Sequence, residues 1–171
     1  MSIIIADASP LIALATIEQL TLLEKLYKEV IIPVAIEQEL KLDSDMPGSR
    51  QLKQAIDDGW LTISRRVLPT ESLRHLLQIL DVGESEAILL TESFSNSQAY
   101  RFLLIDERKG RMIARNRGIK IAGTGAVLLA AKHQGYIDCV KDQLDAMQSA
   151  GYRLSSTLRD RLIQLAGESL G

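Results

Sequence analysis

Residues 2–10 read Ser-Ile-Ile-Ile-Ala-Asp-Ala-Ser-Pro, and this short stretch decides which fold the chain adopts. The run of β-branched isoleucines predicts a buried strand over residues 2–6, and Asp7 follows it with a carboxylate. Ser9 followed by Pro10 is typical of a helix N-cap and the first residue of a helix. A strand that passes directly into a helix is the repeating unit of parallel sheets, so the stretch predicts an α/β protein.

The same alternation of strand and helix continues along the chain. Further strands are predicted at residues 30–32, 60–67, 101–105 and 119–122, and helices at 11–17, 20–26, 33–42, 50–57, 69–80, 83–94, 107–117, 125–134, 138–149 and 155–167, with a polar loop at 95–99. Such alternation predicts a largely parallel sheet, and the ligands of these sheets bind at the carboxyl ends of the strands. The residues that directly follow each strand are therefore the first candidates for a functional site.

Length and composition restrict the class of protein. The 171 residues suit one domain, and hydrophobic and charged fractions of 46% and 25% are ordinary for a globular protein. A net charge of −2 excludes a uniformly basic nucleic-acid-coating protein but leaves room for a local basic patch. The single cysteine, Cys139, excludes an internal disulfide and favours a cytoplasmic location. No apolar stretch resembles a signal peptide or reaches membrane-spanning length, so no membrane partner is expected.

Two aspartates stand directly after apolar strands. Asp7 follows the first strand, and Asp106 follows the strand at 101–105. If these strands are neighbours, both carboxylates project at the same edge of the sheet. Either aspartate alone is explained as a helix cap, but the pair indicates a site for a hard cation such as magnesium or manganese, which prefers oxygen ligands.

Helical phase selects glutamates that could complete such a site. On one helix, Glu39 lies at the edge of the apolar face, whereas Glu37 points to solvent and pairs with a lysine four residues later. On the helix at 83–94, Glu86 projects next to the packed side. Glu84 lies in the first turn, where the helix dipole explains a negative charge. Phase favours Glu86, but the choice between Glu84 and Glu86 stays open.

A basic segment follows Asp106. Residues 108–120 carry six basic residues and no acid, and Arg108, Arg111 and Arg115 recur at helical spacing. The helix dipole disfavours positive charge near a helix N-terminus, so a phosphate backbone bound by these arginines and Lys109 would compensate the cost. A solvated face with ion pairs to nearby acids explains the same pattern equally well.

Four stretches of the chain resemble, in order and spacing, the acidic motifs of PIN domains. They are Ile5-Ala-Asp7-Ala-Ser9-Pro-Leu-Ile-Ala-Leu, Val30-Ile-Ile-Pro33-Val-Ala-Ile-Glu-Gln-Glu39-Leu, Gly83-Glu-Ser-Glu86-Ala-Ile-Leu-Leu and Leu103-Leu-Ile-Asp106-Glu-Arg-Lys-Gly. The last resembles a VapC-like subgroup of prokaryotic PIN proteins that carry the Asp-Glu-Arg-Lys-Gly run. The resemblance implies a mainly parallel sheet of order 3-2-1-4-5 flanked by helices. It also implies a PIN domain over residues 1–135, with a helical extension over 136–171 packed on it.

The resemblance further implies a function. VapC-like PIN proteins are metal-dependent endonucleases that hydrolyse single-stranded RNA, and they act as the toxin of a toxin–antitoxin pair. Asp7, Glu39, Glu86 and Asp106 match the four acidic positions that bind one or two Mg²⁺ or Mn²⁺ ions, and Ser9 matches a small hydroxyl position near the metal. The expected partners are RNA, a cognate antitoxin protein and a second copy of the chain. Without metal, four carboxylates in one pocket repel one another, so at least one should have a raised pKa.

Two departures from the family pattern keep a second interpretation open. The third acid is commonly aspartate in PIN domains but is a glutamate here, and Leu104 stands where many VapC-like proteins have threonine or serine. The alternative is a non-catalytic PIN-fold module that binds RNA or protein. The amphipathic segments 138–149 and 155–167 are expected to pack on the domain, and one of them is hypothesised to form a homodimer or antitoxin surface.

Other classes that use strand-end aspartates fit less well. A phosphatase of the haloacid dehalogenase type needs a second aspartate where Ser9 stands, and a response-regulator receiver needs an aspartate after a middle strand. A P-loop is excluded because no Gly-Lys-Ser/Thr follows Gly123-Thr-Gly125.

Overall fold

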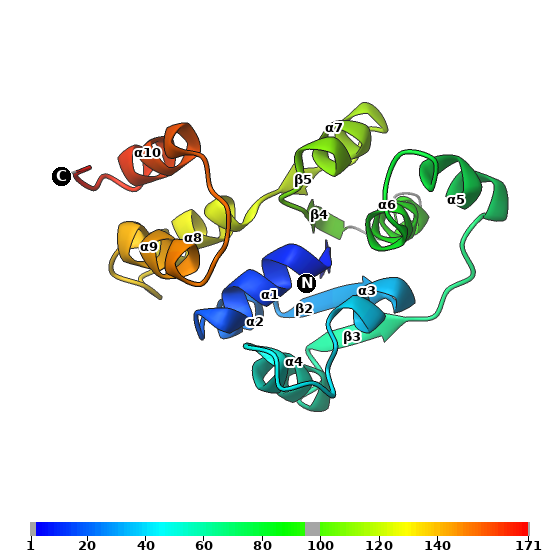
Figure 1. The fold of residues 1–171 in the computed structure, drawn as a ribbon, viewed down its shortest axis with the longest axis horizontal. Helices are drawn as coiled ribbons and strands as arrows, with labels where there is room; N and C mark the ends of the chain where they lie inside the picture. Colours follow the sequence, from blue (N-terminus) through cyan, green and yellow to red (C-terminus); the bar gives the residue numbers. More distant parts are fainter. Residues whose placement is uncertain (1–2, 95–99, 171) are drawn as a thin grey trace.

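The computed structural model describes residues 3–94 and 100–170, which form an α/β fold on a five-stranded sheet (Figure 1). The strands are β1 (Ile3–Ala6), β2 (Glu29–Pro33), β3 (Leu61–Ser64), β4 (Tyr100–Leu104) and β5 (Ile121–Ala122). All neighbours are parallel, in the order β3-β2-β1-β4-β5. The sheet order implied by the family resemblance is therefore confirmed. The loop predicted at 95–99 lies outside the described residues.

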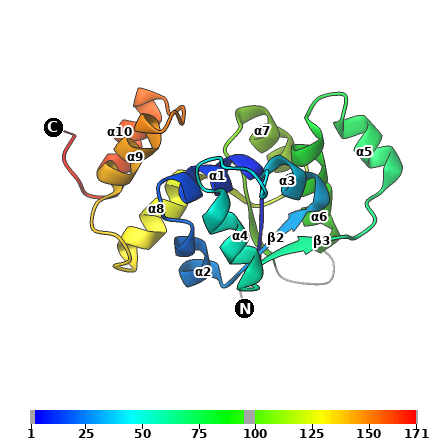
Figure 2. The ribbon, with the colours of Figure 1, turned by 60° about the horizontal axis from the view of Figure 1, so that its bottom comes forward.

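Helices connect the strands and cover both faces of the sheet. They are α1 (Ala8–Thr16), α2 (Thr21–Tyr27), α3 (Val34–Glu39), α4 (Ser49–Asp57), α5 (Thr70–Leu76), α6 (Val82–Phe94), α7 (Arg108–Asn116), α8 (Thr124–His133), α9 (Val140–Ser149) and α10 (Ser156–Leu165). In Figures 1 and 2, α8, α9 and α10 lie together at one end of the molecule and α5 at the other. None of the described helices is long and apolar enough to cross a membrane.

The central strands are apolar on both sides because each face of the sheet carries its own core. One core joins Ile4 and Ile32 of the sheet to α1, α2, α4 and the three C-terminal helices. The other joins Ile5 and Leu103 to α5, α6 and α7. This two-sided burial explains why the strands are continuous hydrophobic runs without alternation.

The entry into α1 differs from the prediction. Asp7, in an extended conformation, occupies the N-cap position, and α1 begins at Ala8. Ser9 is therefore the second residue of the helix rather than its N-cap, and Pro10 is the third. The physical reason is that the backbone N–H of Asp7 still donates to Leu104 O at 2.9 Å, which extends the β1–β4 ladder up to the first helical residue.

The C-terminal helices share the first core. Val140, Leu144 and Met147 of α9 and Leu162 and Ile163 of α10 are all buried in it. A domain boundary between residues 135 and 136 stays a prediction.

Glu168, which follows α10, links the end of the chain to α8 and α9. Its carboxylate accepts hydrogen bonds from the backbone N–H groups of Val140 and Lys141 at 2.7 and 2.9 Å, and it pairs with Lys132 Nζ at 2.7 Å. Burial raises the pKa of Glu168, but the hydrogen bonds from Lys132 and the α9 amides outweigh it and lower this pKa to about 2. Negative charge at a helix N-terminus is also favoured by the helix dipole.

We expect Glu168→Gln to lower the free energy of unfolding at pH 7 by about 1–3 kcal/mol, because charge-assisted hydrogen bonds are lost. Because folding lowers the pKa of Glu168, the stabilisation is present above its unfolded value near 4.5 and fades as the pH falls toward 2. Urea unfolding at pH 7 and pH 3 should thus show a difference between parent and variant that shrinks in acid. Glu71→Gln, at a largely exposed glutamate of α5, is the control. Equal effects of the two substitutions would contradict the assignment.

Candidate functional site

Parallel pairing of β1 with β4 brings two aspartates to one edge of the sheet. Ala6 lies opposite Leu104 in the ladder, so Asp7 and Asp106 leave adjacent strands at nearly the same height. Asp7 is buried, with 4% of its surface exposed. The expectation that the strands bearing Asp7 and Asp106 are neighbours is confirmed.

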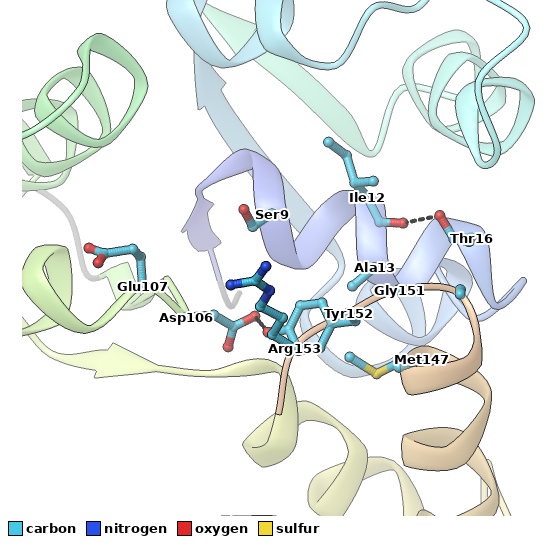
Figure 3. Close-up of a pocket in the computed structure, with 11 residues that line it drawn as sticks. Ser9, Ile12, Ala13, Thr16, Asp106, Glu107, Met147, Gly151, Tyr152 and Arg153 are labelled. Carbon is cyan, nitrogen blue, oxygen red and sulfur yellow. Dashed lines mark hydrogen bonds between the residues drawn. The ribbon is translucent and has the colours of Figure 1, made fainter. Parts of the chain in front are cut away.

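Three hydrogen bonds hold the Asp106 carboxylate. Thr124 at the start of α8 donates its backbone N–H to Oδ1 at 2.8 Å and its hydroxyl to Oδ2 at 2.5 Å. The Tyr152 hydroxyl also donates to Oδ2, from the connection between α9 and α10 (Figure 3). Asp106 is thus oriented by two elements that lie far from it in the sequence.

Two glutamates, one on α3 and one on α6, lie close enough to Asp7 to interact with its charge. Glu39 ends α3, and Glu84 lies in the first turn of α6 with 6% of its surface exposed. Burial, together with repulsion from Glu39, Asp81 and Asp106, raises the pKa of Asp7 to about 7, although a backbone hydrogen bond from Ala8 opposes the rise. Burial, followed by repulsion from Asp81 and Asp7, raises the pKa of Glu84 to about 8. The expected raised pKa is confirmed.

Glu39 responds in the same way. Burial and then repulsion from Asp81 raise its pKa, although a backbone hydrogen bond from Gly83 opposes this effect. The described acids around Asp7 therefore form one electrostatic group, here called the acidic cluster: Asp7, Glu39, Asp81, Glu84, Asp106 and Glu107.

The structure does not bring Glu86 into the acidic cluster. Its Oε1 accepts a hydrogen bond from the Ala35 backbone N–H at 3.0 Å, so it caps the start of α3. Helical phase favours Glu86 over Glu84 only when the helix has a single packed side. Helix α6 is instead buried on nearly all sides, and Glu84 is the more buried of the two glutamates.

Sequence reasoning missed four residues of this site. Asp81 Oδ1 accepts the Glu84 backbone N–H at 2.8 Å, and Glu107 Oε2 accepts the Gly110 backbone N–H at 2.8 Å, so both are helix caps as well as members of the acidic cluster. The Asp-x-x-Glu spacing from Asp81 to Glu84 is a capping signature that could have pointed to it. Thr124 follows a strand, which is also a usable signal. Nothing in the sequence points to Tyr152.

Three glycines make room for the acidic side chains. A Cβ at Gly83 would lie 2.0 Å from Glu39 Oε1, and one at Gly123 would lie 2.9 Å from Asp106 Oδ1. At Gly110 the added carbon would meet Ile105 Cδ1 first, at 2.7 Å, and would lie 3.2 Å from Glu84 Oε1. The backbone therefore leaves space for these carboxylates, although burial of a carboxylate costs free energy compared with its exposure to solvent.

The donor set suits a divalent cation. Buried carboxylates with raised pKa values gain from a positive charge between them, and oxygen ligands are those that Mg²⁺ and Mn²⁺ prefer. Within residues 3–94 and 100–170, no three His, Cys, Asp or Glu side chains stand ready as a complete set of metal ligands. The fit is therefore to an ion held by one or two carboxylates with water completing its shell, as is common for Mg²⁺.

The four basic residues predicted to bind phosphate all lie on α7. Arg111 turns back to the sheet, where its Nη1 donates to Ile105 O at 2.8 Å and lies close to Gly123. Arg108, Lys109 and Arg115 are exposed. Arg111 therefore lies beside Asp106, and the charge of Lys109 lowers the pKa of Glu107, so both belong to the surroundings of the acidic cluster.

Two further predictions concern hydroxyl groups: Ser9 near the metal, and the absence of a hydroxyl at Leu104. Ser9 is exposed and lines a pocket beside Asp106 and Glu107. Leu104 is fully buried and offers no hydroxyl, but Thr124 supplies one to Asp106 from α8. The hydroxyl next to Asp106 therefore comes from α8 and not from β4.

Comparison with known proteins identifies a family for nearly the whole chain. A family model described as PIN domain matches residues 3–168. Neither the curated proteins nor the solved structures yielded a match. The matched range includes both C-terminal helices together with the sheet.

The raised pKa values set the pH dependence of the metal-free protein. Because folding raises the pKa of Asp7 from 3.8 to about 7, the folded state binds the proton more tightly between those values. The contribution of Asp7 is then greatest in mild acid and falls as the pH rises, by at most about 1.4 kcal/mol for each pH unit, and the raised pKa of Glu84 adds to this fall. In EDTA, we expect the free energy of unfolding to fall by a few kcal/mol between pH 5 and pH 8.

Asp7→Asn should make this dependence less steep, since only the Glu84 contribution remains, and should be more stable than the parent at pH 8. Chemical unfolding at several pH values measures both effects. Asp57→Asn, at an exposed aspartate of α4, should leave the parent curve unchanged. A parent protein that gains stability from pH 5 to pH 8 would show that Asp7 is not buried among like charges.

Proposed function

The chain belongs to the PIN-domain family, and from that premise we propose that it is a metal-dependent endonuclease for single-stranded RNA, of the VapC-like toxin kind. The PIN domain is a nuclease-type fold, and its members are generally hydrolases that use divalent metal ions. One observation carries the proposal for this chain: Asp7 and Asp106 leave adjacent strands into an acidic cluster in which the pKa values of Asp7, Glu39 and Glu84 are raised.

We assign the metal site to the group formed by Asp7, Glu39, Glu84 and Asp106, of which one or two carboxylates would hold the ion while water completes its shell. A divalent cation bound there would lower the pKa of a coordinated water and offset the negative charge that develops on a phosphodiester. The chain's own contribution is orientation, because Thr124 and Tyr152 hold the Asp106 carboxylate in one position. Arg111, fixed to Ile105 O beside Asp106, is a basic group placed to hold a phosphate.

The identity of the third acid is part of the proposal. Glu84 replaces Glu86 as the match to the third acidic position of the family, because its pKa responds to Asp7 whereas Glu86 caps α3. The pattern Asp81-Val-Gly-Glu84 also places it at the start of a helix, where the backbone fixes its direction.

The toxin role, an antitoxin partner, a homodimer and a cytoplasmic location rest on the resemblance to VapC-like proteins. One feature of the surface supports a protein partner. Leu158 and Leu165 of α10 are 46% and 60% exposed, although α10 buries other apolar residues. Exposed apolar side chains on a packed helix are a common feature of subunit interfaces.

The alternative is a PIN-fold module that binds RNA or protein without cutting it. The saturation of Asp106 with three hydrogen bonds favours this alternative, because few lone pairs remain for a metal.

Metal binding separates the two functions. We expect 1 mM Mn²⁺ to raise the melting temperature of the parent chain by about 2–4 °C for each kcal/mol of binding energy, and to leave Asp7→Asn unchanged. Asp57→Asn should respond like the parent. Absence of any Mn²⁺ effect on the parent would favour the non-catalytic module.

Paired substitutions test the third acid. We expect Glu84→Gln to reduce Mn²⁺-dependent cleavage of a mixed-sequence single-stranded RNA at least about 100-fold, because a charge that acts on the metal is lost. Glu86→Gln should keep most of the activity, since it only weakens a helix cap. Cleavage time courses at equal concentrations of folded protein give the comparison, and the reverse order of effects would restore Glu86 to the site.

A further inference from the structure

A pocket of about 610 Å³ opens beside the acidic cluster, where the chain between α9 and α10 crosses α1 (Figure 3). Its volume lies within the range of small-molecule sites. Residues from three parts of the chain line it, among them Ile12, Met147, Tyr152 and Arg153. The assigned nuclease residues account for only its Asp106 wall.

The pocket shares Asp106 and Glu107 with the acidic cluster. Asp106 and Glu107 form one side, and Tyr152, which forms another, donates its hydroxyl to Asp106. A nucleic-acid strand whose phosphate lies at Asp7 and Asp106 therefore has its neighbouring nucleoside at the mouth of the pocket. The two sites are close enough for one strand to occupy both.

The chemistry of the lining suits an unstacked base. Ile12, an apolar side chain of α1 that lines the pocket, is 37% exposed, and the exposed Ala150 adds a second apolar surface. Arg153 extends from the opposite wall toward the Ser9 end of α1 in Figure 3. Within the described residues it makes no ion pair or hydrogen bond, so its guanidinium plane is free to stack on a base or to bond its edge.

Charge argues that a base rather than a phosphate enters the pocket. The carboxylates of Asp106 and Glu107 stand on one side, and Arg153 is the one basic residue of the lining. A phosphate there would meet two negative groups for each positive one, whereas a neutral base can accept or donate hydrogen bonds with both kinds.

We propose that this pocket binds a nucleobase of the RNA strand, next to the phosphate that is cut, with Ile12 and Ala150 as its apolar contacts and Arg153 as its polar contact. The inference rests on the proposed function for its assignment to an RNA substrate. It makes the connection between α9 and α10 a specificity-determining element of the nuclease.

Free nucleotides test the pocket without any cleavage. Binding of AMP, CMP, GMP, UMP and ribose 5-phosphate to the full chain in Mg²⁺ is measured by isothermal titration or ligand-observed NMR. We expect at least one nucleotide to bind about tenfold more tightly than ribose 5-phosphate, which has the same phosphate and no base.

Substitutions in the pocket test whether the preference for the base arises there. Ile12→Trp and Ala150→Trp fill the pocket from opposite walls and should remove the preference for the base while leaving ribose 5-phosphate binding unchanged. Arg153→Ala should weaken the preference. Ile79→Trp, at an isoleucine 53% exposed on another part of the surface, and Arg50→Ala on α4 are matched controls.

Equal binding of all five ligands, or a preference that survives both tryptophan variants, overturns the proposal. So does a result in which the tryptophan variants change only the oligomeric state, since the pocket would then be a protein-binding surface. If Mn²⁺ stabilises the parent and RNA is cut while all five ligands bind equally, only this inference fails. If neither metal binding nor cleavage is found but the base preference is present and removed by both variants, the proposed function fails and the base pocket stands.

Discussion

The adjacency of β1 and β4 is the constraint on which the rest of the structure depends. Their parallel ladder places Ala6 opposite Leu104, and the hydrogen bond from Asp7 N–H to Leu104 O carries the pairing one residue further. Cores on both sides bury the carboxyl-terminal halves of these strands, so the register cannot slip without exposing isoleucine and leucine side chains. The position of the acidic cluster is thus guaranteed by hydrophobic burial, which is the largest favourable term in folding.

The same burial disfavours the ionised form of the carboxylates that it brings together. Asp7 and Glu84 are almost inaccessible to water, and the pKa of each is raised first by burial and then by neighbouring acids. A protein of ordinary stability can carry such a cluster only because the cores elsewhere are large. Buried acidic groups with strongly shifted pKa values are characteristic of functional sites. Glycines in the backbone make this packing possible, since a side chain at Gly83 or Gly123 would clash with the carboxylate of Glu39 or Asp106.

The C-terminal segment links the site to the far end of the molecule. Helices α9 and α10 share the core beneath α1, and Glu168 fastens the end of α10 to the start of α9 and to Lys132. The connection between these helices then delivers Tyr152 to Asp106 and Arg153 to the adjoining pocket. A segment that looks like a simple extension in the sequence therefore forms one wall of the site, which agrees with a family match that runs to residue 168.

The sequence by itself determined the alternation of strands and helices, the α/β class and the placement of Asp7 and Asp106 after apolar strands. These features depend on local periodicity and on residues adjacent in the chain, which a sequence shows directly. The resemblance to PIN domains added the sheet order. Tertiary structure alone decided that Glu84 joins the acidic cluster while Glu86 caps α3, because α6 packs on nearly every side and helical phase cannot say which neighbour each side meets. It also brought Tyr152 to Asp106 across 46 residues of chain. Such long-range contacts result from the docking of whole helices, and no local pattern encodes them.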